Sequence, residues 1–251
     1  MIALLVAAVL SIPTAVVEKA LDGQKGAVVI VETGTGEALR EGDTSEKLPP
    51  CSTFKIWNTV FGLETGVIKN ADDLFWKWDG KKRFLDDWSK DQTLRTAFAT
   101  SCVPAYQALA RKIGQERMDA WINKIGYGDK NTSSGLDVFW LPEKGRKPLL
   151  ISPDEQAALM VKLVNGEITL SAHTREVLKD VMLARKTDRG ALYGKTGTGT
   201  DDSGKFNLGW YVGYLESQGR TYAFAAVLKG DVMGKDARAV IERIFTAQEL
   251  L

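Results

Sequence analysis

The two ends of the chain carry strand patterns, and the long stretch between them carries helical patterns. Residues 26–33 (GAVVIVET) are rich in β-branched side chains, and residues 208–217 and 220–230 are two aromatic, β-branched runs separated by Gln-Gly. The order of strands, helices, strands and a last helix predicts an α/β (α+β) fold, in which both ends build one antiparallel sheet flanked by helices. A mainly helical lobe, at about 52–185, is inserted between the sheet-forming ends. We expect a cleft where lobe and sheet meet.

Apolar residues recur at helical spacing in five segments of the middle region, several of which end at Gly, where a left-handed C-cap is favourable. These segments are 93–100, 103–114, 115–126, 153–166 and 171–183. Near the C-terminus, Ala239, Ile241, Ile244 and Phe245 are spaced as on one apolar helix face. The chain contains no repeat and no low-complexity linker, so we expect a single domain spanning 16–251.

Residues 1–15 (MIALLVAAVLSIPTA) contain no charge, and no polar residue precedes Ser11. The stretch is too short to span a bilayer but long enough for the apolar region of a signal peptide, although the usual preceding basic residues are missing. We therefore expect a truncated export signal, a periplasmic or extracellular mature protein and no stable membrane span. A buried N-terminal helix is the alternative.

Charge balance and the scarcity of metal-binding side chains argue against several functions. Lys and Arg number 33 and Asp and Glu number 32, with no basic run, so no nucleic-acid partner is expected. Two cysteines and a single histidine, His173, provide neither a Cys-based zinc site nor a Cys/His metal cluster. His173 lies in a polar, helix-like run and is better explained as a surface residue than as part of a Ser-His-Asp triad. An activated nucleophile would therefore need a base other than imidazole.

Ser52 and Lys55, in STFK, are spaced to lie on one face of a helix, so that the amine can sit beside the hydroxyl. On its own the pair is better explained by a helix N-cap serine and a solvated lysine. However, residues 54–63 (FKIWNTVFGL) are dominated by large apolar side chains, which suits a buried helix. A desolvated lysine can act as a base near neutral pH, and an N–H at a helix start favours a developing oxyanion. Both features favour acyl transfer.

Two further motifs follow in order along the chain. SCV at 101–103 offers a second hydroxyl before a helical run, and KTG at 195–197 is expected on a strand lining the cleft. The ordered set S-x-x-K, S-x-V and K-T-G resembles the serine β-lactamases and penicillin-binding proteins, and its S-x-V is similar to that of class D (oxacillinase-type) β-lactamases. The same resemblance extends over most of the chain after residue 20, in STFKIWNTVFGLETGVI, FLDDWSKDQTLRTAF, SCVPAYQALARKIG, IGYGDKNTSSGLDVFWL, ISPDEQ and GWYVGYLE.

The resemblance implies the serine β-lactamase/transpeptidase-like fold and hydrolysis of the β-lactam amide of penicillin-type antibiotics. It also implies a small-molecule β-lactam partner, no metal and no cofactor other than the CO2 or bicarbonate that carboxylates a lysine. Two other functions stay open: a sensor domain that β-lactams acylate without turnover, and a peptidase acting on peptidoglycan. The peptidase would be expected to carry S-x-N in place of SCV.

Individual roles also follow from the resemblance. Ser52 would be the nucleophile that forms the acyl-enzyme. Lys55 would be carboxylated by CO2 on its amine, giving N6-carboxylysine, and the resulting carbamate would act as general base. Trp140 would donate its indole N–H to this carbamate, and Val103 would keep the pocket apolar. Without the resemblance, Trp140 would be interpreted as a core aromatic.

The resemblance also assigns the remaining parts of the site. Ser101 would relay a proton to the leaving nitrogen, with the positive charge of Lys195 nearby. The backbone N–H groups of Ser52 and Thr198 would form the oxyanion hole. The residues implied in substrate binding are Tyr127, Thr196, Gly197 and Arg238, of which the arginine suits a carboxylate; Arg243 is the weaker positional match.

Three points stay open. The usual Y-G-N of the family is YGD at 127–129 here, which leaves the role of Asp129 undecided. Cys51 and Cys102 each precede or follow a proposed catalytic serine, so they either form a disulfide or remain free thiols. The sequence does not distinguish a monomer from a homodimer, and it does not show which β-lactams are preferred.

Overall fold

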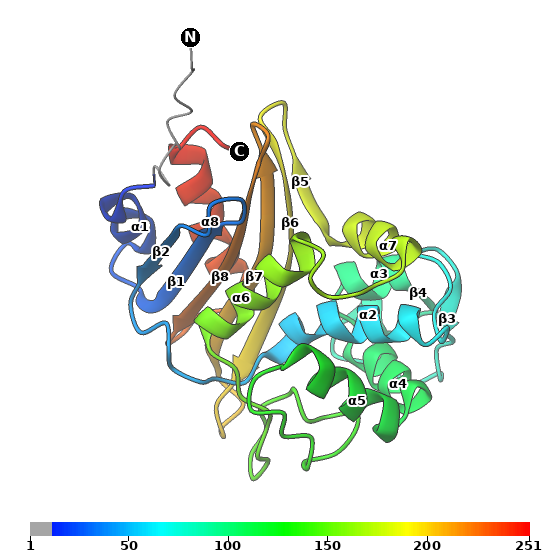
Figure 1. Ribbon diagram of the computed structural model, residues 1–251. Coiled ribbons are helices and arrows are strands. Elements are labelled where there is room, and N and C mark those ends of the chain that lie inside the picture. The colour runs from blue at the N-terminus through cyan, green and yellow to red at the C-terminus, as the bar shows by residue number, and fades with distance from the viewer. Residues whose placement is uncertain (1–11) are drawn as a thin grey trace.

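The computed structural model describes residues 12–251, which form a six-stranded antiparallel sheet with helices on both faces (Figure 1). The strand order is β2-β1-β8-β7-β6-β5, with β1 (Lys25–Glu32), β2 (Ala38–Glu41), β5 (Leu183–Lys186), β6 (Gly190–Thr200), β7 (Phe206–Ser217) and β8 (Arg220–Lys229). β1 from the N-terminal part pairs with β8 from the C-terminal part, in the register Val29 to Ala225. The predicted fold class is confirmed, including the construction of the sheet from both chain ends.

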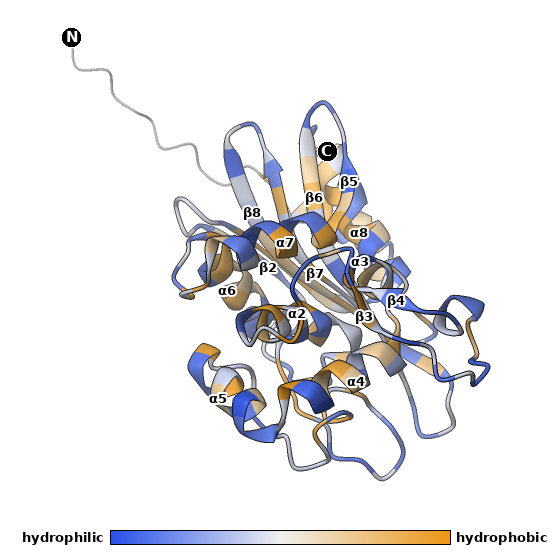
Figure 2. Cartoon of the chain, turned by 90° about the vertical axis from the view of Figure 1, so that its right-hand side faces the viewer, coloured by the Kyte–Doolittle hydropathy of each residue, from blue (hydrophilic) through white to orange (hydrophobic). Residues whose placement is uncertain are grey.

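The helices are α1 (Thr14–Leu21), α2 (Lys55–Glu64), α3 (Leu94–Ala99), α4 (Val103–Ile113), α5 (Gln115–Ile125), α6 (Pro153–Val164), α7 (Ala172–Met182) and α8 (Gly234–Ala247). The predicted helical segments correspond to α3, α4, α5, α6, α7 and α8. Figure 2 shows the helical lobe in front of the sheet, with α2 at its centre.

Alternate residues of the central strands face two separate cores. In β8, Phe224 and Ala226 pack in the core that contains residues of α1 and α8. Their neighbours Ala223 and Ala225 pack in the other core, which contains residues of α6 and the helical lobe. Because successive side chains of a strand point to opposite faces, a strand covered on both sides is apolar at nearly every position.

The buried face of α8 differs by one position from the predicted one. The buried set is Ala237, Val240, Ile241, Ile244 and Phe245, whereas Ala239 is exposed. These five positions follow the i, i+3, i+4, i+7, i+8 pattern of an amphipathic helix, and Ala239 falls outside that stripe. Its small apolar side chain gave a misleading signal.

The inserted lobe contains five helices and a small two-stranded sheet, β3 (Leu74–Trp76) with β4 (Gln92–Thr93). α6 belongs to the predicted lobe range but lies against the sheet, as Figure 1 shows. Within α2, every residue from Lys55 to Leu63 is buried, which is the pattern of a helix surrounded by protein. The expectation of a buried helix around Lys55 is therefore confirmed.

The predicted export signal at 1–15 lies mostly outside the described residues. Ile12 is buried, and α1 begins at Thr14 and packs Val17 and Leu21 into the core it shares with α8. Among the described residues, no helix combines the length and the apolar character that crossing a membrane requires.

Candidate active site

Ser52 and Lys55 are joined by a hydrogen bond on a tight turn that leads into α2. The Nζ of Lys55 donates to the Oγ of Ser52 at 2.7 Å, and Lys55 has no exposed surface. Ser52 lies in a 3-10 turn (Cys51–Phe54), whose first residue, Cys51, has a left-handed backbone (φ +52°). The N-cap of α2 is Phe54, and no side chain caps it. The alternative of a capping serine with a solvated lysine is therefore wrong.

The environment of this pair shifts the proton equilibria of two lysines. Burial lowers the pKa of Lys55 well below its ordinary value, and the positive charge of Lys195 lowers it further. Burial also lowers the pKa of Lys195 to about 7. In the part of the chain that the structure describes, the hydrogen-bond acceptors of both ammonium groups are hydroxyl and carbonyl oxygens, with no carboxylate. Burial thus favours the neutral form of Lys55.

The KTG segment lies on β6, where the strand passes directly beside the nucleophile turn. β5 pairs with β6 only as far as Tyr193, so the edge of β6 beyond it has no neighbouring strand. A Cβ at Gly197 would lie 3.0 Å from the carbonyl oxygen of Pro50 and 3.2 Å from the backbone nitrogen of Thr53. Any other residue would require the nucleophile turn or β6 to shift by a few tenths of an ångström, so glycine suits this close approach. Further along β6, the hydroxyl of Thr198 accepts a hydrogen bond from the Gly234 N–H at 3.0 Å.

Ser101 occupies the connection between α3 and α4, and Val103 is the first residue of α4. The backbone of Ser101 is left-handed (φ +56°), a conformation that costs non-glycine residues free energy and often marks functional sites. Phe98, one turn earlier, places its ring centroid 5.7 Å from the Nζ of Lys195. Phe98 could not be recognised from the sequence as a site residue, because a phenylalanine at helical spacing has the same signal as any core residue.

Trp140 is fully buried and stacks on Phe54, with ring centroids 5.6 Å apart. Its indole Nε1 is buried without a hydrogen-bond partner among the described residues. An unpaired buried donor costs about 1–3 kcal/mol, so such a group calls for an acceptor. A plain core aromatic would not account for this N–H.

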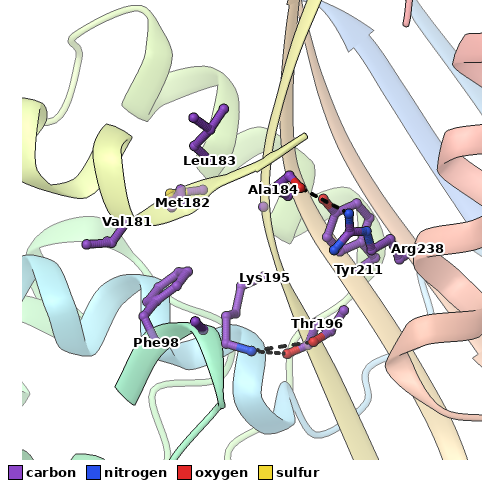
Figure 3. Close-up of a pocket in the computed structure, with 11 residues that line it drawn as sticks. Phe98, Val181, Met182, Leu183, Ala184, Lys195, Thr196, Tyr211 and Arg238 are labelled. Carbon is purple, nitrogen blue, oxygen red and sulfur yellow. Dashed lines mark hydrogen bonds between the residues drawn. The ribbon is translucent and has the colours of Figure 1, made fainter. Parts of the chain in front are cut away.

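A pocket beside Lys195 contains the predicted carboxylate-binding residues (Figure 3). Lys195, Thr196 and Arg238 line it, together with Phe98, Ala99, residues 181–184, Gly194 and Tyr211. The guanidinium of Arg238 donates to Glu242 Oε1 at 2.6 Å and to the carbonyl of Ala184 at 3.1 Å, so its orientation is fixed. Arg243 instead donates to the carbonyl of Ala20 at 3.1 Å and holds α1 in place. Of the two arginines, Arg238 alone lines this pocket.

Tyr127 does not take the predicted substrate-binding position. It has no exposed surface, its hydroxyl donates to Gln156 Oε1 at 3.4 Å, and its ring packs edge-on against Phe54, with centroids 5.1 Å apart. Burial raises the pKa of this phenol well above its ordinary value. We therefore assign Tyr127 a packing role behind the nucleophile turn, together with Gln156, which also bonds Thr53.

The other residues with open roles are structural. Asp129 is exposed, and its carboxylate accepts the backbone N–H groups of Asn131 and Leu150 at 3.1 Å each. Cys51 and Cys102 are both buried free thiols, so no disulfide joins them. His173 is exposed on α7 and contacts the Lys69 carbonyl, as a surface histidine would. Among the described residues, no group of three or more His, Cys, Asp or Glu side chains is arranged to hold a metal ion.

Comparison with known proteins adds independent evidence. A family model described as the penicillin-binding protein transpeptidase domain matches residues 14–247. The probable β-lactamase YbxI of Bacillus subtilis (strain 168) is 38% identical over 180 residues, which cover 72% of this chain and 64% of that protein, just under two thirds of its length. The regulatory protein BlaR1 of Bacillus licheniformis is 30% identical over 189 residues, 75% of this chain and 30% of that protein.

A solved structure extends the similarity to nearly the whole chain. The class D β-lactamase FUS-1 (OXA-85) of Fusobacterium nucleatum subsp. polymorphum matches with a TM-score of 0.86 and 34% identity, over 94% of this chain and 98% of that chain. This similarity is consistent with three features described above: the Ser52–Lys55 pair, the strand that carries KTG and the order of the sheet. The chain belongs to the penicillin-binding protein transpeptidase family and, within it, to the class D β-lactamases.

Proposed function

We propose that this protein hydrolyses the β-lactam amide of penicillin-type antibiotics through an acyl-enzyme on Ser52. The observation that carries the proposal is the fully buried Lys55, whose Nζ lies 2.7 Å from the Ser52 hydroxyl and has no carboxylate partner within residues 12–251. A lysine in this position is a base in its neutral or carboxylated form, and it contacts the hydroxyl of Ser52, whereas the other hydroxyl on the turn, that of Thr53, bonds the carbonyl of Pro50. Family membership supplies the substrate class.

We assign Lys55 as an N6-carboxylysine in the active enzyme. The neutral amine adds to the carbon of CO2 and releases a proton, which leaves a carbamate anion on Nζ. Two features support this assignment: burial favours the neutral amine, and the unpaired indole N–H of Trp140 requires an acceptor. Val103, at the start of α4, completes the apolar surroundings in this proposal.

Acylation then proceeds in two steps, attack by Ser52 and loss of the β-lactam nitrogen. The carbamate accepts the proton of the Ser52 hydroxyl while Oγ attacks the β-lactam carbonyl carbon, and the N–H groups of Ser52 and Thr198 bind the resulting oxyanion. Collapse breaks the carbon–nitrogen bond, and Ser101 delivers its proton to the leaving nitrogen beside Lys195 while it takes over the proton that the carbamate received from Ser52, so the carbamate is an anion again. The close passage of Gly197 along the nucleophile turn supports this oxyanion hole, since it brings the edge of β6 next to Ser52. For deacylation the same carbamate removes a proton from the attacking water, the ester bond to Ser52 breaks, and the proton returns to the Oγ of Ser52.

Substrate binding uses the pocket beside Lys195. Thr196 and Arg238 hold the substrate carboxylate, and Lys195 contributes positive charge while it is protonated. Gly197 lies outside this pocket and serves substrate binding by letting β6 approach the nucleophile turn. Because its bonds to Glu242 and to the carbonyl of Ala184 fix the direction of the Arg238 guanidinium, the carboxylate binds to an arginine that is oriented in advance. We further propose that the domain acts outside the cytoplasm after removal of the N-terminal apolar stretch, with the cut before the buried Ile12 and α1 and not after residue 15 as expected from the sequence. N-terminal sequencing of the mature protein tests that cleavage, and a mature protein beginning at Met1 would contradict it.

Turnover of a chromogenic β-lactam, followed with and without bicarbonate, tests the function. We expect many product equivalents per protein and a rate that rises with bicarbonate until Lys55 is fully carboxylated. The similarity to BlaR1 keeps the sensor function as the rival outcome. One equivalent of product with a stable acyl-enzyme, even in saturating bicarbonate, would establish the sensor and refute the hydrolase.

A further inference from the structure

The connection between β3 and β4 carries two tryptophans with matching hydrogen bonds. It forms an outer edge of the helical lobe (Figure 2). The indole of Trp78 donates to the carbonyl of Lys81 at 2.9 Å, within the same connection. The indole of Trp88 donates at the same distance of 2.9 Å to the carbonyl of Thr100. Trp88 therefore ties this connection to the residue immediately before Ser101.

The carbonyl of Thr100 and the N–H of Ser101 are the two ends of one planar peptide group. Trp88 binds the carbonyl end, and the N–H end donates to the carbonyl of Phe98 at 3.2 Å. The next N–H, that of Cys102, donates to the carbonyl of Ala97 at 2.9 Å. Both peptide groups beside Ser101 are thus held in place.

Ser101 needs such support because its backbone is left-handed, with φ +56°. This conformation is unfavourable for a non-glycine residue and persists only where the surrounding structure holds it. The bonds to Phe98 and Ala97 are those of a helix end, and Trp88 supplies the hydrogen bond from outside that segment. Loss of the indole donor would let the Thr100–Ser101 peptide rotate and turn the Ser101 hydroxyl away.

Trp88 itself is held firmly. It is partly buried against the main core, and its backbone N–H donates to the carbonyl of Leu85 at 2.9 Å. The fully buried Gln92 donates its side-chain amide to the carbonyls of Asp87 and Lys90, at 2.7 and 3.2 Å. The turn around Trp88 is thus clamped on both sides of the tryptophan.

We propose that Trp88 is the positioning residue for Ser101, which fixes the direction of its hydroxyl towards the leaving nitrogen of the substrate. The inference rests on the proposed function, in which Ser101 protonates that nitrogen. It follows that Trp88 affects the acylation step, in which the carbon–nitrogen bond breaks, and leaves deacylation unchanged.

The test compares Trp88→Phe with the matched control Trp78→Phe. Both variants keep an aromatic ring and lose one indole-to-carbonyl hydrogen bond of 2.9 Å, but only Trp88 acts on the peptide before Ser101. Stopped-flow measurement at saturating chromogenic cephalosporin gives the acylation and deacylation rate constants separately. We expect Trp88→Phe to acylate about tenfold more slowly with unchanged deacylation, since misplacing a general acid removes part of a contribution of about 10²- to 10⁴-fold. The acylation and deacylation rate constants of Trp78→Phe should both remain within about twofold of the wild-type values, which is less than the loss of one hydrogen bond in the site would cause.

A double-mutant cycle with Ser101→Ala then separates positioning from general disturbance. In the Ser101→Ala background, Trp88→Phe should cause no further slowing, because the hydroxyl that it directs is absent. Equal acylation rates for the two tryptophan variants, or an undiminished effect of Trp88→Phe without the serine hydroxyl, would overturn the inference. A wild type that is acylated but not turned over refutes only the hydrolase, since the acylation comparison still applies. A wild type that no β-lactam acylates removes both proposals.

Discussion

Replacing Trp140 by Phe should weaken the carboxylation of Lys55 more than it weakens the fold. The variant keeps a ring that can stack on Phe54 and removes one buried N–H that has no partner among the described residues. Without CO2, the wild type carries the cost of that unpaired donor, about 1–3 kcal/mol, and the variant does not. This gain offsets part of the packing lost with the smaller ring.

With CO2 present, the wild-type indole gains a hydrogen bond to an anion. Such a bond contributes about 1.5–3 kcal/mol, which at about 1.4 kcal/mol per tenfold corresponds to about 10- to 150-fold in affinity. We therefore expect the bicarbonate concentration for half-maximal carboxylation to rise by that factor in Trp140→Phe. Carbon-13 NMR of the carbamate signal, titrated with labelled bicarbonate, measures it directly, and the bicarbonate-dependent rise in Tm reports the same equilibrium.

Trp210→Phe is the matched control for this experiment. Trp210 is equally buried, but its indole already donates to the carbonyl of Pro49 at 2.9 Å. Its replacement should lower Tm whether or not bicarbonate is present, because a satisfied hydrogen bond is lost, and the bicarbonate midpoint should stay that of the wild type. A midpoint in Trp140→Phe equal to that of the wild type would refute the assignment of the indole to the carbamate.

Three further variants test other parts of the site. With the pKa of Lys195 at about 7, its ammonium group loses the proton as pH rises above that value, so KM for a penicillin should increase from pH 7 to 9. Lys195→Arg should remove that increase. A KM that rises equally in the wild type and in Lys195→Arg would contradict the assignment of Lys195 to substrate binding. Gly197→Ala should slow acylation by at least about tenfold, because the added methyl would lie 3.0 Å from the Pro50 carbonyl and push β6 away from the nucleophile turn, as stopped-flow kinetics can show. Tyr127→Phe removes only a long hydrogen bond of 3.4 Å, so KM should stay unchanged, and the free energy of unfolding, measured by denaturant titration, should fall by about 0.5–1 kcal/mol. A raised KM would support the substrate-binding role for Tyr127.

The fold was predictable because its signals are local. A β-branched run reads as a strand and a 3.6-residue apolar period as a helix, whichever tertiary contacts follow, and the order of these elements left few ways to close one sheet. The small apolar Ala239 was misplaced because alanine is compatible with either face of α8. The packing of α6 against the sheet could not be predicted from the sequence either, because the apolar face of a helix does not specify which element it packs against.

The catalytic pair was predictable for the same reason. Ser52 and Lys55 are three residues apart, so their contact depends on one turn of backbone, and the surrounding apolar residues indicated burial. Contacts between residues far apart in the sequence could not be predicted in this way. The choice of Arg238 over Arg243 depends on which side of α8 faces the pocket, and the two arginines are only five positions apart in sequence.

The sequence by itself therefore determined the antiparallel sheet, the inserted helical lobe and the presence of a buried serine–lysine pair. Only the tertiary structure decided that Tyr127 lies behind the site, that the indole N–H of Trp140 has no partner in the part of the chain that the structure describes, and that Trp88 bonds the peptide before Ser101. The physical reason is that propensity and periodicity act over a few neighbouring residues. Burial, hydrogen-bond satisfaction and left-handed backbone, in contrast, are set by segments that meet only when the whole chain has folded.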